Sequence, residues 1–531
     1  MTRFLRLVSF FFFIIISASA DELYYNVLDY GAKADAKTVN TKYIQKAIDD
    51  CSKNGGVVLF PSGKYLTGTI YLKDNVTLQL QKGAKIIGST DLRDYPENNP
   101  DYQFLRKGKI KRSLIYAEQC KNISIIGEGT IDGQGGKIIT NRGKPVKGYA
   151  ERPHVIWMIK SKNIKIDGVK LQNSSLWMQH YIGCEKLRIQ NIEIFNHSNK
   201  NNDMMDINGC KDVVISNVIG DSDDDGITLK SSHEMPCENI TITNCVLSSH
   251  CNAIKCGTES NAGFKNITIS NCVIRPSKEK STFYGIPGGV TGISLEVVDG
   301  GNMNGVTISN IVMDSVLVPI FIRLGDRARG YDNNLPKPSV GTIENIHLSN
   351  ITAFNTSFVG SSITGIPGHA VKNITLDNIR IYGEGGRSLD EVKAVIPELE
   401  EEYPSAEMFG ILPAYGFYIR HAENVTLNNV ELYFNKADKR PAISLDDVSR
   451  CKISHLQADI DEASTLIYGN DIQDIYIQNP WLKGKCSSLL EVKGEKSEDI
   501  ILTDVDRLKF NKFVERLEGV SKEIIRIGNT F

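Results

Sequence analysis

The chain has 531 residues, which is enough for one large domain or two ordinary ones. Its 61 basic and 63 acidic residues nearly cancel, which leaves a formal net charge of −2. A nucleic-acid-binding surface requires clustered lysine and arginine, so this balance argues against a nucleic-acid partner.

The first twenty residues, MTRFLRLVSFFFFIIISASA, have the pattern of a targeting segment. Arg3 and Arg6 give a basic start, residues 7–16 form an apolar run, and residues 18–20 are small, as at a cleavage site. The apolar run is too short for a comfortable membrane span. We therefore expect an exported protein, periplasmic or extracellular and without a membrane anchor, that begins near Asp21. Because the segment holds two arginines and no acid, its removal changes the formal charge from −2 to −4.

Residues 38–52, TVNTKYIQKAIDDCS, carry apolar side chains at helical spacing. The residues on this apolar face are Tyr43, Ile44, Ala47, Ile48 and Cys51. This spacing predicts an amphipathic helix. Such a helix can cover the open end of a repeat protein, the class that the following residues indicate.

A phrase of the form N-[IV]-x-[IL]-x-N-[IVC] recurs along most of the chain. Its copies begin at positions 122, 163, 186, 212, 239, 266, 305, 345, 373 and 424. The three steps between positions 186 and 266 are 26, 27 and 27 residues long. Internal repeats of this length are typical of solenoids and propellers.

Each phrase alternates Ile or Val with polar residues, which is the period of a β-strand. A second short strand precedes each phrase, as in MDING, GITLKS, NAIKCG, GISLEV and IFIRLG. No unit contains a helical stretch, and a propeller blade requires roughly 40 residues. The sequence therefore predicts an all-β fold, a parallel β-helix over residues 21–471, whose stacked coils share one long apolar interior.

An asparagine follows the second apolar position of the phrase at a constant phase. It occurs at Asn217, Asn244, Asn271, Asn310, Asn350, Asn378 and Asn429. Asparagine tolerates left-handed backbone at turns and can hydrogen-bond from coil to coil. We therefore expect stacked asparagines at one corner of the solenoid.

Two segments interrupt this pattern. Residues 388–403, SLDEVKAVIPELEEEY, have the composition of a helix-bearing insertion between coils, and residues 472–531 lose the phrase. We expect the latter to form a C-terminal extension packed on the end of the solenoid. The eleven cysteines recur largely at one point of the repeat, which suits buried thiols at least as well as disulfides, and no pairing is assigned. No metal-binding spacing is present, so neither a metal site nor a cofactor is predicted.

The stretch 201–231 places several aspartates beside strands that must be buried. The register of the repeat puts Asp203 beside Asp225 of the next coil, with Asp224 adjacent. Because parallel strands lie roughly 4.8 Å apart, three carboxylates converge on the outer face. Such clustering suits glycoside hydrolysis, in which one carboxylic acid protonates the leaving oxygen and a second carboxylate activates water. Asp203, Asp224 and Asp225 are the predicted catalytic residues.

These motifs resemble glycoside hydrolase family 28, the polygalacturonases and rhamnogalacturonan hydrolases. The N-terminal stretch from Asn26 to Leu80 is similar to the opening of that family, and the likeness runs to about residue 440. The Asn-x-Asp motif reads Asn201-Asn202-Asp203, and the Gly-Asp-Asp motif appears as residues 223–225, DDD, followed by G-I-T-L-K-S. The combination of the two motifs at this spacing carries the resemblance.

The resemblance implies a right-handed parallel β-helix with Asp224 as the general acid. It also implies that Asp203 and Asp225 hold and deprotonate the water, that Asn202 contributes to substrate binding, and that the anomeric centre is inverted. The implied partner is a galacturonic-acid-containing pectic polysaccharide or oligosaccharide. No cofactor is implied, and we expect a monomer.

The chain departs from the family pattern at two places. Where the family has Gly-His-Gly, the 27-residue step from Asp225 puts Asn252 at the histidine position, and His250 lies two residues earlier. His250 is there either a substrate-binding residue or an ordinary turn histidine. Where the family binds the galacturonate carboxylate with Arg-Ile-Lys, this chain has Ser294 and Glu296.

Two cations can compensate for that loss. Lys255 lies in the outward column of Ser294, one coil earlier, and Arg323 points outward one coil later, where its fork suits a carboxylate. Trp177 and His180 precede the acidic motif by one coil, and Trp177 either stacks on a sugar or belongs to the core. These departures make a rhamnogalacturonan-like pectin or a side-chain galacturonide at least as plausible a substrate as homogalacturonan.

Two other functions remain open on the same fold. A polysaccharide lyase would use Ca²⁺ bound by the aspartates and a basic residue as proton acceptor, and its products would absorb ultraviolet light. A non-catalytic carbohydrate-binding solenoid would bind sugar without turnover. Fold alone does not choose among the three.

Overall fold

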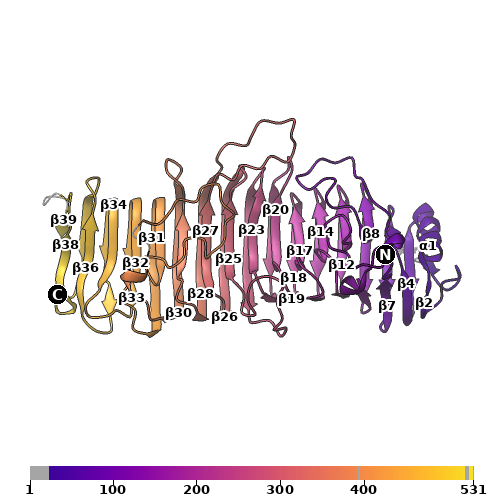
Figure 1. The fold of residues 1–531 in the computed structure, drawn as a ribbon, viewed down its shortest axis with the longest axis horizontal. Coiled ribbons are helices and arrows are strands. Elements are labelled where there is room, and N and C mark those ends of the chain that lie inside the picture. The colour runs from indigo at the N-terminus through magenta and orange to yellow at the C-terminus, as the bar shows by residue number, and fades with distance from the viewer. Residues whose placement is uncertain (1–22, 393–394, 521–524, 530–531) are drawn as a thin grey trace, which may run out of the picture.

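A computed structural model describes residues 23–392, 395–520 and 525–529. The predicted targeting segment, residues 1–20, lies outside the described residues. The strands form one elongated stack that runs from the N-terminal helix to the C-terminal end (Figure 1). Strands of successive coils pair in parallel. The predicted parallel β-helix is confirmed.

Three columns of strands, here called sheets 1, 2 and 3, form the walls of the solenoid. Sheet 1 contains the recurring phrase and consists of β1 (Tyr24–Asn26), β3 (Gly56–Phe60), β6 (Val76–Leu80), β9 (Lys121–Gly127), β12 (Lys162–Asp167), β15 (Glu185–Gln190), β18 (Lys211–Ser216), β21 (Cys237–Thr243), β37 (Glu498–Thr503) and β39 (Ile525–Ile527). Sheet 2 follows it in each coil and consists of β2 (Asp35–Val39), β4 (Gly63–Thr67), β7 (Ala84–Gly88), β10 (Thr130–Asp132), β13 (Lys170–Gln172), β16 (Glu193–Asn196), β19 (Ile219–Ser222), β22 (Val246–Ser249), β33 (Gln457–Ala458) and β35 (Trp481–Leu482).

Sheet 3 completes each coil. It consists of β5 (Ile70–Tyr71), β8 (Ser113–Glu118), β11 (His154–Ile159), β14 (Gln179–Ile182), β17 (Met205–Asn208), β20 (Ile227–Ser231), β23 (Asn252–Ser260), β25 (Thr291–Val297), β27 (Val318–Leu324), β29 (Ser361–Thr364), β36 (Cys486–Lys493) and β38 (Phe510–Arg516). Long strands continue around a corner from one sheet into another: β24 (Phe264–Ile274), β26 (Asn302–Asp314), β28 (Thr342–Thr356), β30 (Val371–Gly385), β31 (Phe417–Lys436), β32 (Ile443–Ser454) and β34 (Thr465–Gln478).

The interior is filled by the alternate apolar residues of each phrase. In sheet 1, for example, Ile164 and Ile166 of β12 pair with Leu187 and Ile189 of β15, and all four side chains are buried. Burial of each such side chain contributes roughly 1.5–3 kcal/mol. The period of two in the sequence therefore fixes which side of each strand faces the core.

The predicted asparagines line the corner between sheets 1 and 2. All seven have positive φ, between 52° and 57°. Their amides form ladders from coil to coil, as when Asn350 donates to Asn310 Oδ1 at 3.1 Å and Asn378 donates to Asn350 Oδ1 at 2.7 Å. The ladder and the left-handed backbone are both confirmed.

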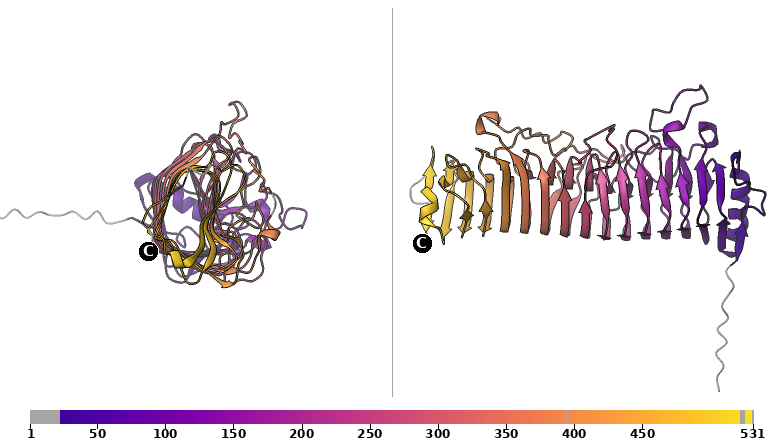
Figure 2. Two further views of the ribbon diagram at one scale, coloured as in Figure 1. Left: turned by 90° about the vertical axis from the view of Figure 1, so that its left-hand side faces the viewer. Right: turned by 90° about the horizontal axis from the view of Figure 1, so that it is seen from below.

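The N-terminal end is covered by α1 (Thr41–Asn54), which confirms the predicted capping helix with slightly later bounds. It buries the predicted face against the end of the stack and places Tyr43 at the rim. Figure 2 shows this helix across one end and long loops projecting from one side of the stack. In the described part of the chain, no helix is long and apolar enough to cross a membrane.

The structure corrects two sequence predictions. The insertion at 388–403 contains no α-helix among its described residues, but a short 3-10 turn, η3 (Leu389–Glu391), and irregular chain. Pro397 lies in the middle of the expected helix, where it lacks an N–H and restricts the preceding residue. The described part of residues 472–531 is not a separate extension. β36 and β37 pair in parallel with β34, and β38 and β39 pair in parallel with β36 and β37 in turn, so these strands continue the coils. Further short 3-10 turns are η1 (Leu92–Asp94), η2 (Gly135–Lys137) and η4 (Arg507–Lys509).

All eleven cysteines lie among the described residues, and none forms a disulfide. Ten of them are buried, and Cys251 is half-buried. Their thiols accordingly act as small apolar core groups in this structure.

Candidate active site

The corner between sheets 2 and 3 brings the three predicted acids together. Asp203 precedes β17, and Asp224 and Asp225 precede β20 in the next coil. The Met204 N–H donates to the Asp225 carbonyl at 2.8 Å, which holds the two turns side by side. One carboxylate oxygen from each acid lies within 4.8 Å of those of the other two. The register argument from the sequence therefore predicts the geometry correctly.

The three acids differ in exposure. Asp203 is 3% exposed and Asp225 is 5% exposed, whereas Asp224 is only half-buried. Asp224 is therefore the acid of the three that is most accessible to a ligand arriving from solvent.

Asp225 is held as a carboxylate by two neighbours from the following coil. Lys255 Nζ donates to Asp225 Oδ2 at 3.1 Å, and Asn252 Nδ2 donates to Oδ1 at 2.6 Å. Burial alone would raise the pKa of Asp225, but Lys255, Lys230 and the bond from Asn252 outweigh it and lower the pKa. Asp225 is thus ionised at the pH values at which the other two acids can be protonated.

The pKa of Asp224 is shifted in the opposite direction, upward. Burial and the negative charge of Asp225 raise its pKa to about 6, although Lys255 and Lys230 oppose the shift. The Asp225 N–H donates to Asp224 Oδ1 at 2.9 Å, and Asn201 Nδ2 donates to Oδ2 at 3.4 Å. Two adjacent residues are therefore poised as a proton donor and a proton acceptor.

Asp203 faces a buried polar cluster behind the site. Lys230 Nζ lies 3.9 Å from Asp203, 3.2 Å from Asp206 and 3.5 Å from Glu259. Burial, Asp206 and Asp224 together raise the pKa of Asp203 well above its usual range, against the effect of Lys230. Burial likewise raises the pKa of Asp206 to about 7. Several acids can lie in this one buried cluster for two reasons. They share the positive charge of Lys230, and not all of them are ionised at the same time.

Two predicted binding residues next to this cluster are buried and do not face a ligand. Trp177 is 3% exposed, and its ring is covered by Lys230, 4.8 Å from the ring centroid, and by the Arg106 guanidinium at 5.3 Å. His180 is buried in register with Asp206, and burial holds its pKa well below 6.5. Of the two alternatives for Trp177, the structure favours the core: the ring packs in a buried cluster and lies against two cations.

Asn202 is also buried and serves the turn. Its amide donates to the carbonyls of Ser174 and Leu176 at 3.0 and 2.8 Å, and its Oδ1 accepts the Asn199 N–H at 2.6 Å. The neighbouring Asn201 contacts Asp224 instead. The motif was located correctly, but the side chain that reaches the site is the one before the predicted residue.

Arg323 lies in the outward column, as predicted, but it is covered and does not face solvent. Its buried guanidinium donates to the backbone carbonyls of Gly365, Glu398 and Leu399 at 3.0, 2.6 and 3.2 Å. The inserted segment 386–416, which the sequence register does not locate, folds over this strand and uses Arg323 as an anchor. Arg323 is therefore unavailable to bind a substrate carboxylate.

His250 and Glu296 are the remaining predicted positions of interest. His250 is fully buried and contacts Asp223 and the Glu279 carbonyl, so it does not reach the three clustered acids. Glu296 accepts a bond from Ser294 Oγ at 2.6 Å, and burial raises its pKa to about 7. Below that pH it is mostly neutral, so the repulsion of a carboxylate that the sequence suggested is absent.

Several residues at the site were missed from the sequence. Lys230 belongs to the G-I-T-L-K-S motif and could have been predicted from the register. Its strand partner, Asn208, lies two residues after Asp206 and therefore on the same side of β17 as that acid. Arg106, Tyr403 and Arg327 come from loops, for which the repeat gives no register. Tyr403 Oη lies 3.3 Å from Lys255 Nζ, and the Arg327 guanidinium lies 5.2 Å from the Tyr403 ring centroid.

The three clustered carboxylates have the spacing of a possible cation site. Lys255 and Lys230 already bring two positive charges to them. The pKa of Asp224 is raised and that of Asp225 is lowered. The cluster can therefore donate a proton from one carboxyl group and accept one at another, as glycosidic bond cleavage requires.

Comparison with known proteins agrees with this class. The model of the family described as Glycosyl hydrolases family 28 matches residues 56–400, about two thirds of the chain. The chain therefore belongs to glycosyl hydrolases family 28.

Individual relatives cover smaller parts. A probable polygalacturonase of Vitis vinifera is 33% identical over 216 residues, which are 39% of this chain and 44% of that protein. An exo-poly-alpha-D-galacturonosidase of Dickeya chrysanthemi is 39% identical over 119 residues, 21% of this chain and 20% of that protein. The chain thus spans less than half the length of these curated relatives. An exopolygalacturonase structure from Thermotoga maritima superimposes with a TM-score of 0.56 and 25% identity, covering 68% of this chain and 87% of that one.

Proposed function

We propose that this protein hydrolyses a galacturonic-acid-containing pectic polysaccharide, of the polygalacturonase or rhamnogalacturonan type. The observation that carries the proposal is the opposite pKa shift of two adjacent residues, Asp224 upward to about 6 and Asp225 downward, in a cluster of three carboxylates. Membership of family 28 and the names of the relatives support the substrate class.

In this mechanism Asp224 is the general acid and gives its proton to the leaving glycosidic oxygen. Asp225, held ionised by Lys255 and Asn252, takes a proton from the attacking water, and Asp203 holds that water. The bond from the anomeric carbon to the leaving oxygen breaks as the water oxygen bonds to that carbon. One proton leaves Asp224 and one arrives on Asp225, so the pair must exchange protons with solvent before the next turnover.

Inversion of the anomeric centre is part of the proposal and rests on the family resemblance. The carboxylate oxygens, within 4.8 Å of one another, are closer than the roughly 6.5–9.5 Å usual between the two carboxyl groups of inverting enzymes. Proton NMR of the first-formed anomer tests this point by itself. An initial product of retained configuration would exclude the water-activating role of Asp225.

Three residues support an acidic substrate. Lys255 contacts both Asp225 and Tyr403, and the Arg327 guanidinium lies over the Tyr403 ring. Among the residues that the structure describes, no carboxylate lies within ion-pair distance of Arg327, so its charge is available to a ligand. Glu296, neutral below about pH 7, does not oppose a bound carboxylate. Arg327 is thus the cation of this group that can contact a substrate carboxylate, whereas Lys255, buried against Asp225, contributes only its positive charge.

Reducing-sugar release from a panel of homogalacturonan, rhamnogalacturonan and oligogalacturonides tests the proposal, with Asp224→Asn as the control. We expect release by the native protein and its loss in the variant. Products that absorb ultraviolet light would instead indicate a lyase. Calorimetric binding without any release, unchanged in Asp224→Asn, would indicate a non-catalytic carbohydrate-binding protein.

We also infer that the protein is exported. The inference is supported by the basic, apolar and small-residue pattern of residues 1–20 and by a polymeric substrate that does not enter cells. N-terminal sequencing of the protein from fractionated cells tests it. A mature N-terminus near Asp21 in the periplasm or medium is expected, and an intact Met1 in the cytoplasm would refute export.

A further inference from the structure

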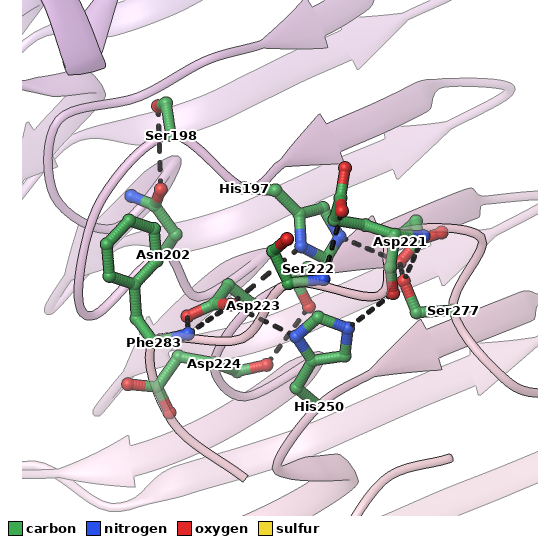
Figure 3. A network of polar contacts seen from close by, with 12 residues as sticks. His197, Ser198, Asn202, Asp221, Ser222, Asp223, Asp224, His250, Ser277 and Phe283 are labelled. Atoms are coloured by element: carbon green, nitrogen blue, oxygen red, sulfur yellow. Dashed lines mark hydrogen bonds and ion pairs between the residues drawn. The ribbon is translucent and has the colours of Figure 1, made fainter. Parts of the chain in front are cut away.

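A second cluster lies beneath the acidic turn, on the side away from Asp225. It consists of His197, Asp223 and His250, one residue from each of three consecutive coils (Figure 3). The strand pairs Asn196 with Ser222 and Ser222 with Ser249 place these three residues at one register position. None of them is used by the mechanism above.

The three side chains are enclosed and point at one another. The side chains of His197, Asp223 and His250 are 3%, 0% and 0% exposed. His250 Nδ1 lies 3.0 Å from Asp223 Oδ1, and His197 Nδ1 lies 4.0 Å from the same oxygen. One ligand atom from each residue lies within 4.8 Å of the other two.

The far nitrogen of each histidine is already bound to an acceptor. His197 Nε2 lies 2.8 Å from Asp221 Oδ1, and His250 Nε2 lies 3.0 Å from the Glu279 carbonyl. In the neutral rings these contacts place the hydrogen on Nε2 and leave both Nδ1 lone pairs directed at Asp223. Metal-bound histidines are held by such a partner behind the ring.

Without a further group, this arrangement is incomplete. His197 Nδ1 is buried and has no hydrogen-bond partner among the described residues. His250 Nδ1 lies 3.0 Å from Asp223 Oδ1, a contact that a bound cation would replace. Asp223 accepts the Phe283 N–H at 2.9 and 3.2 Å and retains lone pairs for another partner. A cation between the three residues would satisfy all of these atoms.

We propose that His197, Asp223 and His250 form a binding site for a divalent transition-metal ion, with Zn²⁺ the best match. Two imidazole nitrogens and one carboxylate are a typical zinc donor set. Bonds of about 2.0–2.2 Å separate tetrahedral ligand atoms by roughly 3.3 Å, between the 3.0 and 4.0 Å that separate Asp223 Oδ1 from the two histidine nitrogens here. Calcium and magnesium prefer oxygen ligands and would fit less well.

The ion would have a positioning role. Asp223 directly precedes the proposed general acid, and the loop 275–290 is bound to the same cluster through Ser277 Oγ on Asp221 at 2.6 Å and the backbone of Glu279 and Phe283. A metal at this point would join three coils and that loop beneath Asp224. The proposal does not depend on the identity of the polysaccharide.

The test is metal analysis of the full mature chain. Protein stripped with a chelator is incubated with Zn²⁺, passed through a desalting column and analysed by mass spectrometry of the metal. One zinc per chain is expected in the native protein and none in His197→Gln or His250→Gln. With Co²⁺ in place of zinc, we expect the visible absorption of a tetrahedral site in the native protein alone.

Three control variants isolate the site. His455→Gln removes an exposed histidine, Cys251→Ser removes the half-buried thiol, and Asp203→Asn alters the other acidic cluster. All three are expected to retain the zinc. No stoichiometric zinc in the native protein, zinc retained in both histidine variants, or zinc lost in Asp203→Asn would overturn the proposal.

A second measurement guards against misfolding. Zinc should raise the melting temperature of the stripped native protein and leave that of His197→Gln unchanged, because a ligand stabilises only the state that binds it. His197 is the safer variant since its Nδ1 has no protein partner to lose. Equal zinc-induced shifts in the native protein and His197→Gln would also overturn the proposal.

Discussion

At two corners of each coil, equivalent residues of successive coils lie side by side, but the side chains there have different roles. At the corner between sheets 1 and 2, successive coils carry the same neutral side chain, and asparagine amides bond in a ladder. At the corner between sheets 2 and 3, equivalent positions carry different ionisable residues, as in His197, Asp223 and His250. Identical neutral neighbours stabilise the stack, whereas unlike or like charges at the same spacing shift each other's pKa. The repeat fixes where the corner side chains lie, and the residues that differ from coil to coil supply the acid–base groups.

The largest effect is expected from Asp225→Asn at the charged corner. Loss of the proton acceptor should reduce kcat by at least about 10²–10⁴-fold, the contribution usual for general acid–base catalysis. Assays of product release at saturating substrate measure it. Asp212→Asn at an exposed ladder position is the control, because asparagine suits a ladder and activity should not change. Asp212 lies at the start of β18, in the ladder between sheets 3 and 1, so comparable losses in both variants would mean that the effect is not specific to the acidic cluster.

The pH profile tests the two proton roles together. Activity requires Asp224 protonated and Asp225 ionised. Since the pKa of Asp224 is about 6, kcat/KM should fall about tenfold per pH unit well above that value. Because the pKa of Asp225 is lowered, the acid limb should lie below the usual aspartate range. A profile that stays flat far above pH 6 would contradict the assignment of Asp224 as the acid.

Lys255→Met removes the charge beside Asp225 and keeps most of the side chain. The pKa of Asp225 should rise, by roughly 1–3 units for loss of a close opposite charge, so the acid limb should move to higher pH. Because Lys255 also lowers the pKa of Asp224, the alkaline limb should move in the same direction. The measurement is kcat/KM against pH for both proteins. An unchanged acid limb would show that Lys255 does not set this pKa.

Arg323→Ala tests whether this residue anchors the insertion rather than binds substrate. Loss of its bonds to buried carbonyls should lower the free energy of unfolding by about 1.5–3 kcal/mol. Urea denaturation measures the change, and Arg188→Ala on the exposed face of sheet 1 is the control with little expected effect. A raised KM for acidic substrate with unchanged stability would restore the substrate-binding role.

The smallest effect is expected at the neutral corner. Asn310→Ala should cost about 1–2 kcal/mol, because alanine at φ 57° is strained and the ladder bond is lost. Asn310→Gly keeps the backbone conformation free of strain and should cost less. Both variants should retain full activity. Equal costs in the two variants would show that the amide ladder, and not the left-handed backbone, dominates at this corner.

Much of the fold could be predicted because it repeats. The period of two fixes the buried face of each strand, and the alignment of successive coils, 22 residues from Asp203 to Asp225 and 27 from Asp225 to Asn252, places these three residues in one column, as the structure confirms. The end of the solenoid differs from the prediction because the last coils keep the alternation of a strand but lose most of the phrase, although Asn479 still occupies the corner between sheets 1 and 2. The recurring asparagine phrase is therefore not required for a coil to form.

The environment of the site was harder to predict. Arg323 and Trp177 occupy the expected strands or turns, but loops far away in sequence cover them. Such loops have no period, and their path depends on packing against sheet 3. A residue in an outward column is therefore exposed only if no loop crosses it.

The sequence by itself determined the stacked coils, the asparagine corner and the meeting of three carboxylates, because these follow from strand period and spacing alone. Only the tertiary structure decided which of those acids keeps its proton, which cations are free and which are anchors, and that two histidines face Asp223. These outcomes depend on burial and on neighbours supplied by other coils and loops, and the electrostatic energy of a charged group is set by those surroundings rather than by its place in the repeat.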